Sequence, residues 1–332
     1  MFIRSFICTV LFSMTFLSVS CHRVTPSDLK TQLEIANPKW DGTFYAGYYA
    51  NKTPVFEFTD GPEINAVALS GKNLNNFRPL KDICLRILCL RKCEITSLDF
   101  LSSLNWEPEA IVELQNCKKI VNYRGLKNLP LTVINISNTP FFDTTLLGSK
   151  LLSVYLEHTN VKKLDFAKPE IIEDLIFIKK PGGPDADIRQ ISEMKRLVHL
   201  QLKNIKNLNG INFTSLQYLQ SLSLSHIDSV RFPKLAHSVI SSIWIEDCPD
   251  LTIGETLNNK FIDRLCLMRC GDPGKLLAQI ANTKINVLVI NGAHISNFSF
   301  LKRIKDLKHV RFQNCTGLPE KLNLPFVEVV IE

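Results

Sequence analysis

The chain of 332 residues has no second long hydrophobic run after its first twenty residues, and it has no block of like charges. Hydrophobic residues make up 45% of the chain and charged residues 21%, which excludes the disordered and fibrous classes. The net charge is +7, but Lys and Arg are scattered, and no basic stripe with interleaved aromatics indicates a nucleic-acid surface. We therefore expect a folded protein that does not bind nucleic acid.

The first twenty residues have the features of an export signal. One basic residue, Arg4, precedes an apolar run, and Ser18 and Ser20 occupy the two small-residue positions before a cleavage site. The stretch LSVSC at 17–21 resembles the lipobox of bacterial lipoproteins, although Ser18 stands where that motif usually has leucine. We expect residues 1–20 to be a signal peptide and the protein to be exported to the cell envelope. It would be tethered to a membrane through a lipid on Cys21, or it would be periplasmic or secreted.

A repeat runs through the rest of the chain. LRILCLRKCEI at 85–95 matches IDRLCLMRCGD at 262–272, and both fit the template L-x-x-L-x-L-x-x-[N/C/T/A]-x-[L/I]. This template recurs with a period of about 22 residues. The template resembles the 22-residue, SDS22-like subclass of bacterial leucine-rich repeat proteins. The resemblance implies an α/β solenoid shaped as a curved horseshoe, with short parallel strands on the concave face and short helices or 3-10 turns on the convex side. Units begin near 64, 85, 109, 131, 151, 172, 197, 219, 240, 262, 285 and 307, with a partial unit from 327.

Residues 22–63 do not fit the repeat, whereas residues 64–332 form a repeat domain of about twelve units and a terminal half unit. The sequence predicts a helix that is capped at Thr25 or Ser27 and ends before Pro38. An aromatic-rich stretch follows, and it either seals the end of the first repeat, as solenoids require, or offers a platform for a glycan. We favour the cap. The aromatic residues are Trp40, Phe44, Tyr45, Tyr48 and Tyr49.

The two quoted cysteine pairs raise the question of a metal site. Cys89 and Cys266 take the fifth template position, which faces outward, whereas the ninth position turns inward, so the members of a pair diverge and cannot share a metal ion. We therefore expect a thiol probe to label the outward-facing Cys89 and Cys266 and not the inward-facing cysteines. The family resemblance implies that the inward cysteines form a ladder of hydrogen bonds to the backbone. Neighbouring rungs lie about 4.8 Å apart, which is too far for a disulfide, so we expect mostly free thiols. These ladder residues are Cys93, Cys117, Cys248, Cys270 and Cys315, with Thr139 and Thr159 in the same role.

Catalytic patterns are missing from the repeat. His158, His199 and His226 are separated by one or two units, so no base lies within reach of a nucleophile, about 3 Å. The stretch PGGP at 181–184 lacks the lysine and the following helix of a phosphate loop. We predict a protein that is not an enzyme and that uses no cofactor and no metal.

Outward positions of the repeat define a candidate binding surface. Exposed aromatic, arginine and methionine residues are the types that contribute most to binding at interfaces, and exposed isoleucines on a strand need a cover. We therefore predict that the concave face binds a protein partner, and a passive structural or scaffolding role in the envelope is the alternative. The predicted ligand-binding residues are Tyr155, Glu157, His158, Ile176, Ile178, His199, Trp244, Glu246, Arg264 and Met268.

Overall fold

The structure is a computed structural model in which the chain forms two compact units, one ending at Leu131 and the other beginning at Thr132. The predicted signal peptide and Cys21 lie outside the described residues. At 48–50 and 53–55 only the backbone is described. The described residues are 24–50, 53–55, 64–183, 185–236, 239–253, 255–278, 280, 282–319, 322, 324 and 327–332.

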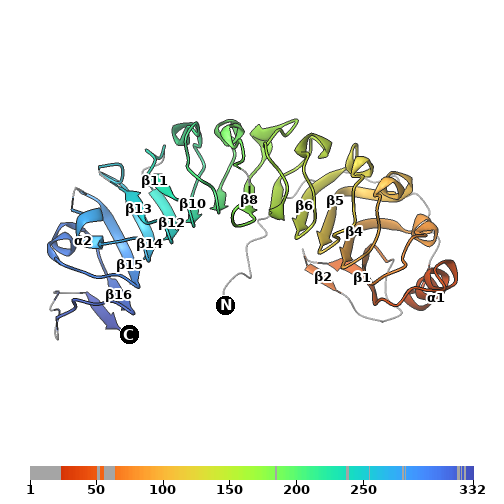
Figure 1. Cartoon of the computed structure of the whole chain (residues 1–332), viewed down its shortest axis with the longest axis horizontal. Helices are drawn as coiled ribbons and strands as arrows, with labels where there is room; N and C mark the ends of the chain where they lie inside the picture. The colour runs from red at the N-terminus through yellow and green to blue at the C-terminus, as the bar shows by residue number, and fades with distance from the viewer. Residues whose placement is uncertain are drawn as a thin grey trace. The chain divides into compact units, whose positions relative to one another are not determined.

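Unit 1 contains three parallel strands, and a 3-10 turn follows each strand on one side of the sheet (Figure 1). Leu88 and Leu90 on the middle strand are fully buried because alternate side chains of each strand point toward these turns. The strands are β3 (Ala66–Ser70), β4 (Cys84–Arg91) and β5 (Asn105–Gln115), and the turns are η1 (Arg78–Asp82), η2 (Asp99–Ser103) and η3 (Arg124–Leu126).

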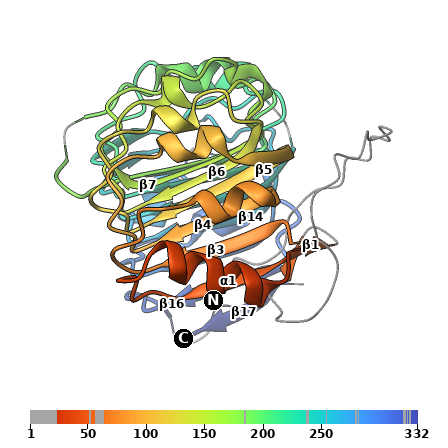
Figure 2. The ribbon, with the colours of Figure 1, turned by 90° about the vertical axis from the view of Figure 1, so that its right-hand side faces the viewer.

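A helix and an antiparallel strand precede the first parallel strand (Figure 2). The helix, α1 (Pro26–Ala36), starts after Thr25, whose side chain accepts a hydrogen bond from the Asp28 amide at 3.1 Å. Its Leu29 and Leu33 are buried, and it contacts η1. β1 (Phe44–Ala50) pairs antiparallel with β3 and then with β2 (Thr53–Val55). The predicted helix is confirmed, and the segment covers an edge of the first repeat.

The aromatic stretch contributes to this packing. The Trp40 indole Nε1 donates to the Ser70 carbonyl oxygen at 2.7 Å. A Cβ at Gly42 would lie 1.6 Å from the same oxygen, so only glycine allows this close approach. Phe44 is buried, whereas Tyr45 is 47% exposed. These contacts support the cap interpretation, and the glycan platform stays a prediction.

Unit 2 repeats the strand and turn pattern with short connections (Figure 1). Every predicted repeat unit from 131 onward contains a parallel strand. The strands are β6 (Leu131–Ser137), β7 (Ser153–Thr159), β8 (Asp174–Lys179), β9 (His199–Lys203), β10 (Ser221–Ser225), β12 (Val239–Glu246), β14 (Phe261–Met268), β15 (Lys284–Asn291), β16 (His309–Gln313) and β17 (Glu328–Ile331). The turns are η4 (Thr144–Leu146), η5 (Pro169–Ile171), η6 (Arg189–Glu193), η7 (Phe213–Ser215), η8 (Ser299–Arg303) and the short helix α2 (Pro273–Leu276).

One stretch of unit 2 replaces the 3-10 turn by strands. β11 (Ser229–Arg231) and β13 (Asp250–Thr252) follow β10 and β12 and pair with each other in parallel. The predicted parallel-strand repeat with 3-10 turns and little helix is therefore confirmed, with this pair as a local variation. No helix in the part of the chain that the structure describes is long and apolar enough to span a membrane.

The residue after most strands has a left-handed backbone. The φ angles at this position lie between 49° and 63°. This conformation turns the chain so that the next side chain points back into the core, and it costs least for Gly, Asn and Asp. The sequence follows that preference only in part, because basic residues and histidine also occur. The residues are Lys92, Asn116, Asn138, Asn204, His226, Asp247, Arg269, Gly292 and Asn314, and His158 has the same conformation one residue before the end of β7.

Candidate functional site

The open face of unit 2 is the side of its sheet opposite the 3-10 turns, and it carries the partly exposed side chains. Strand pairing places these side chains in straight rows across the sheet, one residue from each strand. The central row, from β6 to β17, is Asn135, Tyr155, Ile176, Gln201, Ser223, Trp244, Cys266, Val289, Arg311 and Val330.

The structure separates the predicted binding residues into two groups. The first group lies on β7 to β9 and comprises Tyr155, Glu157, His158, Ile176, Ile178 and His199, and the second lies on β12 and β14 and comprises Trp244, Glu246, Arg264 and Met268. Between the groups runs β10, whose open-face residues are Ser221, Ser223 and Ser225. The short serine side chains leave the groups separated by a low strip. The sequence did not predict this strip, although SLSLS at 221–225 carries the signal.

The first group is a half-buried apolar patch with a polar margin. Tyr155 pairs in register with Ile176, and both are partly exposed. Burial and the nearby Asp174 carboxylate raise the pKa of the Tyr155 phenol. His199 Nδ1 lies 2.6 Å from Asp174 Oδ1, and the Ser153 hydroxyl donates to Asp174 Oδ2 at 2.7 Å. The Asp174 carboxylate is therefore held by two polar contacts within the molecule.

The second group centres on Trp244, whose side chain is 39% exposed. In its row Trp244 lies between Ser223 and Cys266, both of which are much smaller. Met268 is partly exposed, and Arg264 is exposed. The indole is therefore a large apolar surface that stands above its neighbours, with charged groups around it.

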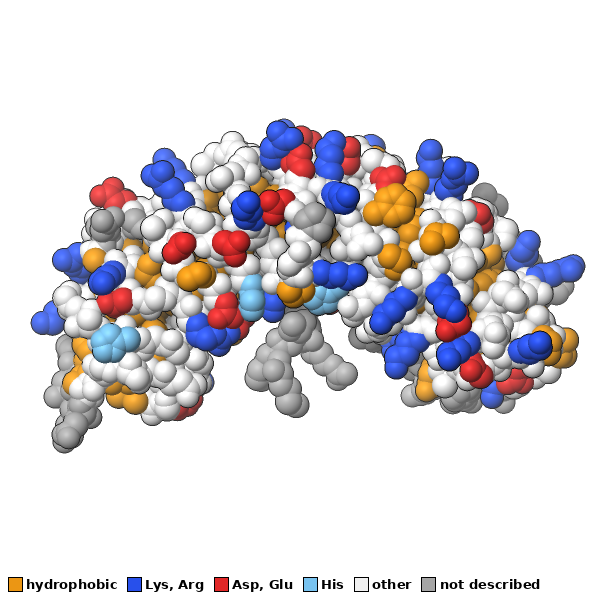
Figure 3. Space-filling model, in the orientation of Figure 1, with side chains coloured by type: hydrophobic (Ala, Val, Ile, Leu, Met, Phe, Trp, Pro, Cys, Tyr) orange, Lys and Arg blue, Asp and Glu red, His pale blue; other side chains and the backbone are white. Residues whose placement is uncertain are grey.

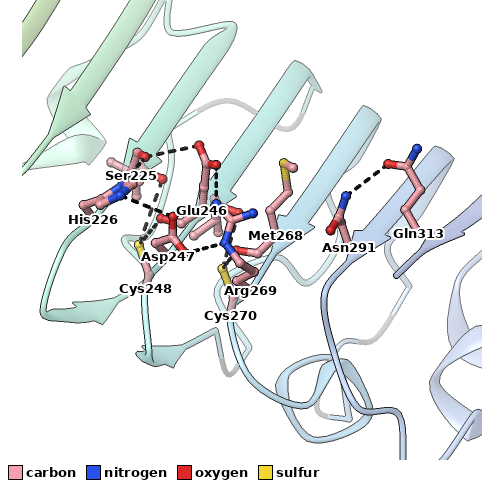
Figure 4. A network of polar contacts seen from close by, with 12 residues as sticks. Ser225, His226, Glu246, Asp247, Cys248, Met268, Arg269, Cys270, Asn291 and Gln313 are labelled. Carbon is pink, nitrogen blue, oxygen red and sulfur yellow. Dashed lines mark hydrogen bonds and ion pairs between the residues drawn. The ribbon is translucent and has the colours of Figure 1, made fainter. Parts of the chain in front are cut away.

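Charged side chains at the ends of β10, β12 and β14 form one network (Figure 4). Arg269 donates from Nε to Asp247 Oδ1 at 2.6 Å and from its terminal nitrogen to Glu246 Oε1 at 2.6 Å. His226 Nε2 lies 3.3 Å from Asp247 Oδ2, and the Ser225 hydroxyl donates to Glu246 Oε2 at 3.3 Å. The Arg269 guanidinium holds the pKa of Asp247 below its usual range. The network joins three strands and leaves neither acid unpaired.

Replacing Arg269 by glutamine should lower stability at neutral pH but not in acid. Arg269 lowers the pKa of Asp247 in the folded state. The stability that this ion pair adds is therefore fully present above the ordinary carboxyl pKa, and it is lost as the pH falls through the folded-state pKa of Asp247. The effect is small because the pair is partly exposed. Urea unfolding at pH 7 and pH 3 measures it, with Arg311→Gln as the control on the same face. An equal loss at both pH values would contradict the role given to Arg269.

Cys89 and Cys266 face the open side of the sheet but are not exposed, which corrects the sequence prediction. Their side chains are only 4% and 1% accessible. Cys266 lies between Trp244 and Val289 on the adjacent strands, and larger neighbours cover it. The Cys89 thiol donates to Glu113 Oε2 at 3.4 Å. The prediction was wrong because alternation along a strand fixes which face a side chain takes, but not how far its neighbours rise above it.

Thiol labelling at pH 8 should now follow a different order. Cys84 and Cys315 are partly exposed and should react first, whereas Cys266 should be as slow as Cys270. Burial raises the pKa of Cys266 to about 11. The thiolate is the reactive form, so its rate should rise about tenfold per pH unit up to that value. Isotope-coded alkylation with peptide mapping measures each site, and rapid labelling of Cys266 at pH 8 would refute its burial.

The inward cysteines hydrogen-bond the preceding rung, as the predicted ladder requires. Cys117 Sγ donates to the Leu90 carbonyl oxygen at 3.3 Å, and Cys270 Sγ donates to that of Ile245 at 3.3 Å. Cys93, Cys248 and Cys315 make the same contact with Leu69, Leu224 and Ile290 at 3.5, 4.0 and 3.5 Å. All cysteines of the described residues are free thiols.

The threonines at the ladder position differ from the cysteines. Thr139 donates within its own turn, to Ser137, at 3.1 Å. Among the described residues the buried Thr159 hydroxyl has no hydrogen-bond partner, and it lies next to a register shift between β7 and β8. Parallel strands in register, 3-10 returns and a ladder to the preceding rung are together decisive. The chain has a leucine-rich repeat fold.

Other parts of the described surface are weaker candidates for a functional site. A shallow depression of about 570 Å³ lies beside the network and is lined by Arg269, Asp272, Lys275, His294 and Ser296, among others. Asp272 accepts from the Ser296 hydroxyl, and Arg269 is held by Glu246 and Asp247. Among the described residues no group of three or more His, Cys, Asp or Glu side chains is placed to hold a metal ion.

Comparisons with known proteins give similarity in fold only. No family model and no curated protein matches the sequence. An internalin (InlF) from Listeria monocytogenes is 15% identical over 79% of this chain and 86% of its own, with a TM-score of 0.49. A leucine-rich repeat protein of Leptospira interrogans is 14% identical over 76% and 73%, with a TM-score of 0.44. The functional domain of InlJ from L. monocytogenes, described as including a cysteine ladder, is 12% identical over 74% and 73%, with a TM-score of 0.38.

Proposed function

We propose that this chain is a non-catalytic protein of the bacterial cell envelope that binds a protein partner on the open face of unit 2. The observation that carries the proposal is Trp244, a large aromatic side chain 39% exposed in the middle of the sheet. Tryptophan is enriched among the few residues that supply most of the binding energy at protein interfaces. Trp244 lies between the smaller Ser223 and Cys266, so its indole protrudes from the sheet and can insert into a pocket of a partner.

The apolar patch of Tyr155, Ile176 and Ile178 supports a second contact with the same partner. These side chains are half-buried on rigid strands, so little conformational entropy is lost when a partner covers them. Strands β9 and β10 separate the patch from Trp244, which is about 14 Å at the usual strand spacing. A single protein surface of ordinary size can cover both contacts.

The envelope location follows from the leader sequence. The signal-peptide pattern at 1–20 supports export, and the lipobox-like stretch before Cys21 supports a lipid anchor. The structure describes neither segment, so both stay part of the proposal.

A pull-down from native membranes tests the function. The bait is the exported chain, and the test variant carries Ile176→Asp and Trp244→Asp. Val121→Asp is the matched control, since Val121 is 75% exposed and belongs to unit 1. A protein recovered by wild type and control but lost with the test variant supports recognition. Identical recovery by all three would refute it and favour the passive scaffold.

A further inference from the structure

The low strip of β10 is the part of the open face where the side chains are smallest. Ser223 lies at its centre, in register with Gln201 on β9 and with Trp244 on β12. The other two serines of the strip each contact a polar side chain of the molecule. The centre of the strip therefore differs from its ends.

The Trp244 indole differs from the other two tryptophans of the chain in its hydrogen bonding. Trp40 Nε1 donates to a carbonyl oxygen, that of Ser70, at 2.7 Å. Trp106 Nε1 donates to the Leu101 carbonyl oxygen at 2.9 Å. The Trp244 N–H has no acceptor among the residues that the structure describes. A partner that covers this indole must therefore supply an acceptor, because a buried N–H without one loses the hydrogen bond that it makes to water.

Two further neutral groups lie in the same row. The Gln201 amide and the Ser223 hydroxyl are partly exposed, and neither forms a hydrogen bond with the described part of the chain. From β9 to β12 the row therefore offers an amide, a hydroxyl and an indole N–H. Gln201 and Trp244 are two strands apart, which is about 10 Å.

The charges around this row cancel. From β9 to β14 the open face and its margins carry the cations Lys203, Arg264 and Arg269 and the acids Glu246, Asp247 and Asp263. The hydrogen bonds from Arg269 lower the pKa of Asp247, and the charge of Lys203 contributes, so these groups already act on one another. The flank seen in Figure 3 also mixes both signs. The stretch therefore selects neither an acidic nor a basic segment.

The backbone of the strip is not open to a partner. β10 pairs in parallel with β9 on one side and with β12 on the other, so a partner strand cannot add to the sheet here. Recognition must use side chains, and the free backbone groups must come from the partner. A polyproline II segment has no internal hydrogen bonds, so its carbonyl oxygens are free, and it repeats every three residues, or about 9 Å. That repeat matches the spacing of Gln201 and Trp244.

We propose that the partner presents an uncharged, proline-containing segment in the polyproline II conformation along the row from Ile176 to Trp244. One carbonyl oxygen accepts from Trp244 Nε1, and another, three residues away, accepts from the Gln201 amide. A proline ring packs on the indole, which is how aromatic grooves bind such segments. Ile176 pairs in register with Gln201, so the same segment reaches the apolar patch on β8. The inference rests on the proposed function, because it assigns a conformation to the partner of that face.

Uncharged synthetic peptides test the conformation. The probe is an acetylated and amidated peptide of three Pro-Pro-Leu units, and the matched peptide has three Ser-Ser-Leu units. Isothermal titration calorimetry should show the proline probe binding at least about tenfold more tightly, because its conformation is preorganised. Its dissociation constant should change less than about twofold between low and high salt, since no ion pair forms. Equal binding of the serine peptide, or a strong salt dependence, would overturn the proposal.

Two variants test the hydrogen bonds. Trp244→Phe keeps an aromatic ring but removes the N–H donor, and Gln201→Leu removes the amide at similar size. Each should weaken binding of the proline probe about fivefold or more. Gln217→Leu is the matched control, because Gln217 is exposed in the connection between η7 and β10, outside the row. Thermal unfolding of all three should agree with wild type, and unchanged affinity in Trp244→Phe would refute donation from the indole.

A neutral sugar is the competing occupant, because an indole and an amide also suit a pyranose ring. Cellotetraose is therefore titrated in parallel. Its binding in preference to the proline probe, with loss in Gln201→Leu, would show a glycan site and refute the peptide segment. If both ligands fail while the pull-down still depends on Trp244, the proposed function stands and the polyproline segment is wrong.

Discussion

Aspartate at Trp244 is expected to weaken partner binding about 30-fold or more, which corresponds to the roughly 2 kcal/mol that defines a dominant interface residue. The substitution removes the only residue in the central row between β9 and β14 that rises above its neighbours, and it places a charge where the partner brings apolar surface. Titrating bait against solubilised membranes and quantifying the recovered protein gives the apparent dissociation constants. A change of less than threefold would contradict a central role for the indole.

The same variant should keep its thermal stability. Trp244 is 39% exposed and its core-facing neighbours, Ile243 and Ile245, are untouched. Thermal unfolding by circular dichroism should therefore agree with wild type within a few degrees. Loss of both binding and stability would attribute the effect to unfolding, and Ile176→Asp alone then decides the role of the face.

Alanine at Gly125 is expected to cause a large loss of stability in unit 1. A Cβ at Gly125 would lie 1.7 Å from the Leu98 carbonyl oxygen and 3.1 Å from the Asp99 Cα. These are backbone atoms of the preceding turn, which other hydrogen bonds hold, so neither rotates away. We expect destabilisation of about 3 kcal/mol, at the upper end of overpacking effects, because neighbouring turns must separate.

Gly182→Ala is the matched control. Gly182 has a left-handed backbone with φ of 68°, and nothing lies within 4 Å of a Cβ there. Its alanine variant should lose only the conformational cost, about 1 kcal/mol. Urea unfolding of both variants, with amide exchange on β4 and β5, separates the two causes. A Gly125→Ala variant as stable as the control would show that the turns can move apart freely.

The repeat was predictable from the sequence because its periodic leucines determine the core directly. Leu88 and Leu90 are buried where the template puts them, and α1 begins after Thr25 as its capping pattern indicates. Predicted binding residues such as Tyr155 and Met268 also lie on the expected face of the sheet, since alternation along a strand depends on sequence alone.

What a side chain does on that face was less predictable. Neighbours on a sheet come from other repeat units, so the depth of Cys266 depends on Trp244 and Val289, which are more than twenty residues away. The pairing of Arg269 with Asp247 also joins residues of two different repeat units. Such contacts become visible only when the register between strands is known, which the template gives approximately and the structure gives residue by residue.

The cysteine ladder also bears on how a chain of this kind changes during evolution. Each ladder bond, such as Cys270 to Ile245, joins one unit only to the unit before it. Gene duplication or deletion of a whole unit therefore recreates the same bond at the new junction and disturbs no other. An insertion of an odd number of residues inside a strand would move core leucines to the open face. The length of the protein, and with it the breadth of its binding surface, can therefore evolve in steps of one repeat while the fold is preserved.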